Sequence, residues 1–172
     1  MPAGWSDEPV LDLRRDPLDN IWALQGKQAI RLPETGGWET IPLPLGPSVK
    51  LHALSFDAQG RMVVALESDG LLIREPNGSS RQLTTRQGLP RDRINVGLLD
   101  RRGALWVGSD GAGLAVQVVP SLRVLAEDPE TGANLGLGAV GRFLELGPGD
   151  LLMGGSNGLF RWQEGKGITG RW

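Results

Sequence analysis

The chain has 172 residues, of which 40% are hydrophobic and 22% are charged, and its formal net charge is −2 at pH 7. This length suffices for one domain or one array of repeats, and the slightly negative charge argues against binding to nucleic acid. There is no cysteine, no long apolar run and no positively charged start, so we expect no disulfide framework, no membrane insertion and no signal peptide in this segment.

A set of short β-strands occupies the first part of the chain. Residues 1–8 are expected to be a polar lead-in, and the first unit spans residues 9–47, where a run of prolines ends it. Its first strand alternates imperfectly, because Asp12 and Arg14 interrupt the apolar side. The expected strands are Pro9–Arg15, Asn20–Leu24, Gln28–Leu32 and Trp38–Leu43.

Three further units follow, and they span residues 48–90, 91–137 and 138–172. The second unit is expected to contain the strands Lys50–Phe56, Arg61–Glu67, Gly70–Glu75 and Ser80–Thr84. In the third they are Ile94–Leu99, Ala104–Gly108, a strand that begins near Gly113, and Leu122–Ala126, after which comes an acidic, glycine-rich loop, Glu127–Gly138. In the fourth they are Ala139–Glu145, Asp150–Gly154, Gly158–Trp162 and Ile168–Trp172. No window has helical periodicity, so we expect an all-β chain.

The turn between the first two strands shows that these units are repeats. The segment DAQGRMV at 57–63 aligns with DRRGALW at 100–106, and weaker copies begin at residues 16 and 146. The spacings between these turns are 41, 43 and 46 residues. A period in the low forties with four short strands per unit is typical of propeller blades. The sequence therefore predicts a β-propeller built of four-stranded antiparallel blades, with four blades in this chain.

A lone blade cannot cover both of its faces, so neighbouring blades must stack and the ring must close or leave faces exposed. Three arrangements satisfy this requirement: a closed four-bladed ring, a ring of about eight blades shared by two chains, or part of a larger propeller. We favour part of a larger natural protein that closes its ring by self-association.

Two tryptophans, Trp22 and Trp106, occupy one repeat position, where the other two units have Val63 and Leu152. We expect these large apolar residues to pack between blades.

A second recurring position points to turn geometry. Asp69, Asp110 and Asn157 each precede a glycine, and recurrence in successive units is typical of a turn rather than of a site. With one histidine and no cysteine, the chain is expected to hold neither a metal nor another cofactor.

Two motifs that would indicate an enzyme have simpler explanations. Residues 136–141 spell GxGxxG, but this dinucleotide fingerprint works only before a helix, and a strand is expected here. Ser48, His52 and Asp57 are the residue types of a hydrolytic triad, but no nucleophile elbow surrounds Ser48. No catalytic residue is therefore predicted.

Polar residues that do not repeat gather at the starts of the first strands of units two to four. Loops and strand ends on one face of a propeller are where ligand contacts usually arise, so we expect a polar, partly cationic funnel near the axis. The alternative is that these charges are only solvated loop residues. The candidate ligand-binding residues are Lys50, His52, Arg91, Asp92, Arg93, Asn95 and Arg142.

The third unit resembles the two-component regulator propeller repeat. The matching residues are Gly88-Leu89-Pro90, Ile94, Asp100, Gly103, the segment LWVGS at 105–109 and Gly111–Leu114. This resemblance implies a periplasmic propeller in the sensor region of a bacterial signalling protein, and in some relatives the ligand is an oligosaccharide. Relatives normally have more blades than four and carry an output domain.

The predicted function is a non-enzymatic, ligand-binding sensor module, with a small molecule or an oligosaccharide as ligand. An alternative is an enzyme like the streptogramin lyases, whose blades are similar but which would need a catalytic histidine, and His52 is the single histidine here. The other alternative is a structural propeller that binds protein partners.

Overall fold

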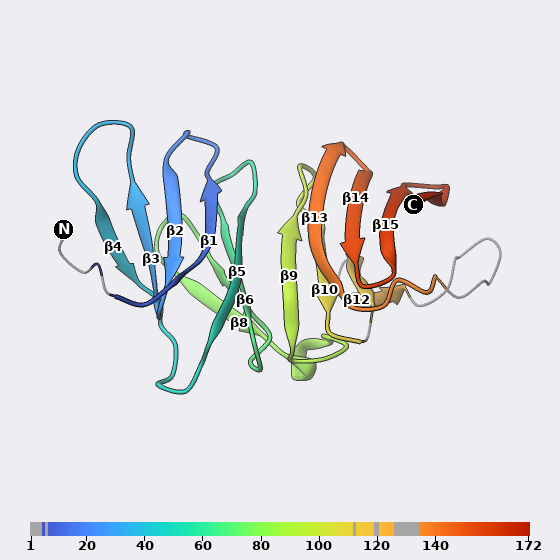
Figure 1. Cartoon of the computed structure of the whole chain (residues 1–172), viewed down its shortest axis with the longest axis horizontal. Coiled ribbons are helices and arrows are strands. Elements are labelled where there is room, and N and C mark those ends of the chain that lie inside the picture. The colour runs from blue at the N-terminus through green and yellow to red at the C-terminus, as the bar shows by residue number, and fades with distance from the viewer. Residues whose placement is uncertain (1–4, 6, 112, 119–120, 126–134) are drawn as a thin grey trace.

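The computed structural model (Figure 1) describes residues 5, 7–111, 113–118, 121–125 and 135–172. Most of the predicted lead-in and of the predicted loop Glu127–Gly138 lies outside these residues. In this part of the chain, sixteen strands form four antiparallel sheets, and in each sheet four consecutive strands pair in chain order. The predicted all-β fold of four four-stranded blades is confirmed.

The sheets are named blades one to four in chain order. Blade one contains β1 (Val10–Arg15), β2 (Ile21–Gln25), β3 (Gln28–Leu32) and β4 (Glu39–Pro42). Blade two contains β5 (Leu51–Phe56), β6 (Met62–Leu66), β7 (Leu71–Arg74) and β8 (Ser80–Leu83). Blade three contains β9 (Ile94–Leu99), β10 (Leu105–Ser109), β11 (Leu114–Val118) and β12 (Ser121–Leu125). Blade four contains β13 (Val140–Gly147), β14 (Asp150–Gly155), β15 (Gly158–Gln163) and β16 (Gly167–Arg171).

Among the described residues, one short helix interrupts the strand pattern. It is the 3-10 turn η1 (Thr85–Gln87), which lies between blades two and three. In the part of the chain that the structure describes, no helix is long and apolar enough to span a bilayer.

Three apolar clusters lie between consecutive blades, one at each boundary. Members of these clusters include Trp22 and Leu54, Val63 and Val107, and Trp106 and Phe160. The expectation that both tryptophans pack between blades is confirmed, because the ring of Trp22 lies 5.1 Å from that of Phe56, and the ring of Trp106 lies 4.5 Å from that of Trp162.

The four blades form an open arc. Figure 1 shows blades one and four at opposite ends of the molecule, with β5 and β9 between them. Within the described residues, no apolar cluster joins blade four to blade one. The inner strands β1, β5, β9 and β13 follow one another along the concave side of this arc.

An aspartate holds the turn that follows the inner strand in three of the blades. Oδ1 of Asp57 accepts hydrogen bonds from the backbone N–H groups of Gln59 and Arg61, at 3.0 and 2.7 Å. The glycine three residues after the aspartate, Gly60, has φ +78°, a conformation that other residues adopt at a cost. This chemistry explains why the D-x-x-G segment recurs along the sequence.

Candidate ligand-binding site

A groove of about 700 Å³ lies along the axis, between the inner strands of the four blades. Every inner strand contributes side chains to its wall. The charged and aromatic residues of this wall are Arg14, Arg15, Arg101, Arg142, Glu145, Phe56 and Phe143. A concave site with aromatic walls and a few convergent charges is the usual setting for a small ligand.

Each inner strand contains a β-bulge near its start. In β5, Leu51 pairs with Leu66 and Ala53 with Ala65, so that His52 is the extra residue. The same irregularity occurs in the other three inner strands, and the extra residues in the four blades are Leu11, His52, Asn95 and Gly141. A bulge shifts the alternation of side chains, so the residues after it face sides that simple alternation does not predict.

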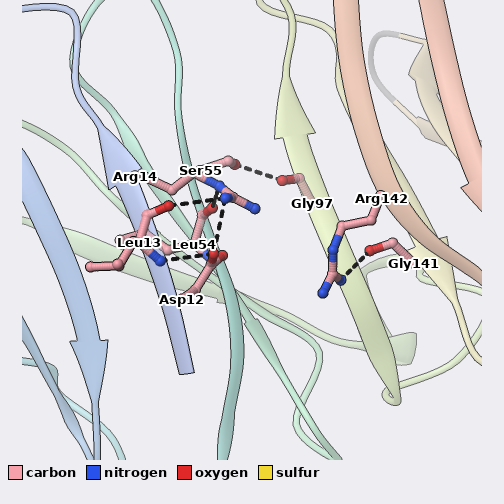
Figure 2. A network of polar contacts seen from close by, with 8 residues as sticks. All are labelled: Asp12, Leu13, Arg14, Leu54, Ser55, Gly97, Gly141 and Arg142. Carbon is pink, nitrogen blue, oxygen red and sulfur yellow. Dashed lines mark hydrogen bonds and ion pairs between the residues drawn. The ribbon is translucent and has the colours of Figure 1, made fainter. Parts of the chain in front are cut away.

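Asp12 and Arg14 connect blade one to blade two. The Arg14 Nε atom donates to the Leu54 carbonyl at 3.0 Å, and Oδ2 of Asp12 accepts from the Leu54 N–H at 2.9 Å (Figure 2). The two side chains also form an ion pair at 2.9 Å. The two charges that interrupt the apolar pattern of β1 therefore bind the backbone of Leu54 in β5 across a blade boundary.

The next two boundaries have their own polar bridges. The Ser55 hydroxyl donates to the Gly97 carbonyl at 2.6 Å, between blades two and three. Glu145 accepts from the backbone N–H of Arg101 at 3.1 and 3.3 Å, and its side chain is only 12% exposed. The Arg101 guanidinium lies 3.7 Å from the same carboxylate. These contacts neutralise the charge of Glu145, the acidic residue of the groove wall.

Arg142 carries the positive charge that remains. Its guanidinium donates to the carbonyl of its neighbour Gly141 at 2.6 Å, and within the described residues no acidic side chain pairs with it. In Figure 2, Arg14 of β1 and Arg142 of β13 lie on opposite sides of the Ser55–Gly97 contact, and both residues line the groove. The groove can therefore accept an anionic group on its blade-four side.

Arg142 is the only member of the predicted set that lines this groove. His52 and Asn95 occupy equivalent bulge positions, as their alignment predicted, but His52 is exposed on β5 and the Asn95 amide donates to the Val140 carbonyl at 3.2 Å. Lys50 lies 3.5 Å from Glu67 and lines a separate hollow between blades one and two.

The three residues before β9 lie apart from the groove wall. Asp92 accepts from the backbone N–H of Thr85 at 2.6 Å and from its hydroxyl at 3.1 Å, which fixes the loop around η1. Arg93 forms an ion pair with Asp110 at 3.0 Å, and Arg91 is exposed. These charges therefore do not converge on one point together with Arg142.

Sequence reasoning missed three of the groove arginines, Arg14, Arg15 and Arg101. Arg14 and Arg15 are the last two residues of β1, and Arg101 follows the end of β9, so all three lie next to an aspartate turn, whereas the predicted set lies mostly at the strand starts. The signal that could have found Arg14 is the charge inside an otherwise apolar first strand.

The two enzyme motifs are both used structurally. Gly136 and Gly138 adopt positive φ values of 58° and 66°, and β13 begins at Val140, so the GxGxxG segment ends inside a strand rather than before a helix. The Asp57 carboxylate is almost fully buried and is 2.6 Å from Nε of Arg61, which leaves it engaged in its own turn.

Comparison with known proteins identifies the fold. No protein-family model matches the chain, and no curated protein gives a significant match. Among solved structures, a catalytically inactive histidine-to-alanine variant of virginiamycin B lyase from Staphylococcus aureus, with quinupristin, aligns with a TM-score of 0.74 and 14% identity. The alignment covers 98% of this chain and 57% of the lyase. The chain is an array of propeller blades.

Extracellular domains of signalling proteins from B. thetaiotaomicron have the same fold. One, from a protein described as the one-component system BT4673, aligns with a TM-score of 0.62 and 13% identity over 100% of this chain and 29% of that chain. Another, from a protein described as the hybrid two-component system BT3049, aligns with a TM-score of 0.56 and 16% identity over 98% and 23%. These neighbours agree with the predicted resemblance to the two-component regulator propeller, and the array spans little more than half of the lyase and less than a third of these two.

Proposed function

We propose that this array is a non-enzymatic ligand-binding module of a bacterial sensor protein, and that it binds a small anionic molecule or an acidic oligosaccharide in the axial groove. The observation that carries the proposal is the Arg142 guanidinium, which has no acidic partner among the described residues and lines a groove with three further arginines. The extracellular sensor domains among its structural neighbours support a location outside the cytoplasm.

The chemistry of the wall favours an acidic sugar. A guanidinium presents a planar fork of donors that matches a carboxylate or a sulfate in two hydrogen bonds. Phe56 and Phe143 line the same groove and offer apolar ring surface to the carbon face of a sugar. Glu145 does not oppose an anion strongly, because Arg101 and its backbone N–H already hold its carboxylate.

The test is calorimetric titration with an oligomer of a uronic acid, compared with a neutral oligosaccharide of equal length. We expect binding of the acidic oligomer alone, with an affinity that falls as salt is raised from 50 to 300 mM, since ion pairing drives it. Equal binding of both sugars, or binding of neither, would contradict the proposal.

The lyase among the structural neighbours makes turnover of a lactone the competing function. The single histidine, His52, is exposed on β5 and does not line the groove. We therefore expect no cleavage of quinupristin by the wild-type chain. Cleavage that is lost in His52→Ala would establish the enzyme and overturn the sensor proposal.

A further inference from the structure

The two ends of the arc expose apolar side chains that internal blades bury. Leu13 on β1 is 59% exposed, and Leu144 on β13 is 58% exposed. Leu11 and Ile21 are also exposed on blade one, and Leu146 and Leu159 on blade four. Scattered exposed leucines need no explanation, but these lie at the two ends of one array of stacked sheets.

The repeat fixes which residues meet across a blade boundary. In each inner strand, the side chain at one repeat position points toward the following blade. The side chain of the residue immediately before it points toward the preceding blade. The Arg14 side chain thus donates to the Leu54 carbonyl, and the Ser55 hydroxyl donates to the Gly97 carbonyl. At the third boundary, Leu98 and Phe143 pack against one apolar cluster.

Leu144 and Leu13 are the two members of this series that face no other blade within the described residues. The residues that face the following blade are, in order, Arg14, Ser55, Leu98 and Leu144, and those that face the preceding blade are Leu13, Leu54, Gly97 and Phe143. Among the described residues, no sheet packs on the face of blade four that carries Leu144 or on the face of blade one that carries Leu13.

We propose that a second copy of this chain closes the ring, with blade four of each copy packed against blade one of the other and Leu144 seated on Leu13. Both side chains are apolar, and the repeat places them at matching heights of their inner strands. Two copies supply eight blades, within the range of four to eight that propellers typically have. The assembly has twofold symmetry, and two equivalent boundaries form at once.

The area of a blade face favours closure over an open chain of copies. Four strands about 4.8 Å apart, each of about five residues rising about 3.3 Å, present a flat face of roughly 320 Å². One boundary then buries roughly 650 Å² in total, below the ~1,200 Å² at which stable interfaces begin. Two boundaries reach that size, so the closed pair of copies is the stable form.

The axial site is incomplete without this partner. The groove has walls from four inner strands on one side, and the second copy would place its own four inner strands, with their arginines, on the other. The proposal can be tested without any ligand, so its failure and the failure of the proposed function are distinguishable.

The first experiment is sedimentation velocity of the wild-type chain at 1–100 μM. We expect a mass of twice 18.4 kDa. Leu13→Lys and Leu144→Glu should each weaken dimerisation at least tenfold, and the double variant should recover it, because each boundary then pairs a lysine with a glutamate. Leu18→Lys, at a 77% exposed turn residue away from both faces, is the matched control and should remain a dimer.

Cross-linking tests the same pairing independently. The chain has no cysteine, so Leu13→Cys and Leu144→Cys introduce unique thiols. With a short bis-maleimide, a mixture of the two single variants should give covalent dimers, and neither variant alone should. A wild-type monomer at all concentrations, a ladder of larger products from the double cysteine variant, or dimers indifferent to Leu13→Lys and Leu144→Glu would overturn the proposal. Circular dichroism melting confirms that each variant is folded.

Discussion

The carboxylate of Asp100 accepts a hydrogen bond from the indole Nε1 of Trp106 at 3.0 Å, while its other oxygen accepts the backbone N–H groups of Arg102 and Ala104, each at 2.9 Å. Asp16 holds Trp22 in the same way at 2.8 Å. One buried carboxylate thus closes the turn after the inner strand and also orients the indole that fills the next blade boundary. The spacing of six residues from aspartate to tryptophan, which Asp16–Trp22 and Asp100–Trp106 share, follows from this double use.

We expect Asp100→Ala to lower the free energy of unfolding by about 3 kcal/mol, because three donors lose a buried acceptor. Asp110→Ala is the control: Asp110 is half-exposed and forms an ion pair with the exposed guanidinium of Arg93, so its loss should cost about 0.5 kcal/mol. Urea unfolding followed by circular dichroism measures both. Equal midpoints for the two variants would show that the Asp100 contacts contribute little.

Asp19 is the single non-glycine residue with positive φ among the described residues, at 63°. The equivalent turn positions hold Gly60 and Gly103, with φ values of 78° and 81°. We expect Asp19→Gly to raise the stability by about 0.5 kcal/mol, since it relieves strain and loses only an exposed ion pair with Arg15.

Gly103→Ala is the reverse experiment and should destabilise the chain by about 1 kcal/mol, because alanine is strained at this φ. Thermal melting of both variants checks the pair. A lower melting temperature for Asp19→Gly would mean that the aspartate side chain stabilises its turn more than the positive φ costs.

Arg142→Ala should weaken binding of an acidic oligosaccharide at least tenfold, because the groove loses the guanidinium that has no acidic partner in the described chain. Arg91→Ala removes the same charge from an exposed residue outside the groove wall and should change the affinity less than twofold. Calorimetric titration of both variants gives the comparison. If they weaken binding equally, net charge rather than the groove determines affinity.

Acid should destabilise the fold. Arg161 hydrogen-bonds to Asp150 and lowers the pKa of that carboxyl from 3.8 to about 2. Burial opposes the charged form of Asp16, but the hydrogen bonds from Trp22 and Asn20 outweigh it, and the pKa of Asp16 is also lowered.

A lowered pKa in the folded state means that the unfolded chain binds protons first, so the stabilisation is present above pH 3.8 and is lost as pH falls towards about 2. Melting temperatures measured between pH 5 and pH 2 should fall, and Asp150→Asn should flatten this dependence. A melting temperature that rises on acidification would contradict the expected loss of stability in acid.

Strand positions could be predicted because they depend on local alternation and on turn residues. Every predicted strand is present, and its ends differ from those observed by at most two residues. The candidate site could not be predicted to the same degree. His52 and Asn95 were aligned correctly with each other, yet of the predicted set only Arg142 lines the groove.

The sequence by itself determined the four blades, the aspartate turns and the tryptophans between blades, because each depends on residues close together in the chain or on a repeated position. Only the tertiary structure decided which charges share the axis. A bulge in each inner strand shifts the direction of the side chains after it, and the curvature of the arc brings Arg14 and Arg142, far apart in sequence, to the same groove. The exposed faces at Leu13 and Leu144 have the same origin, since whether an array of stacked sheets closes depends on how its ends meet in space.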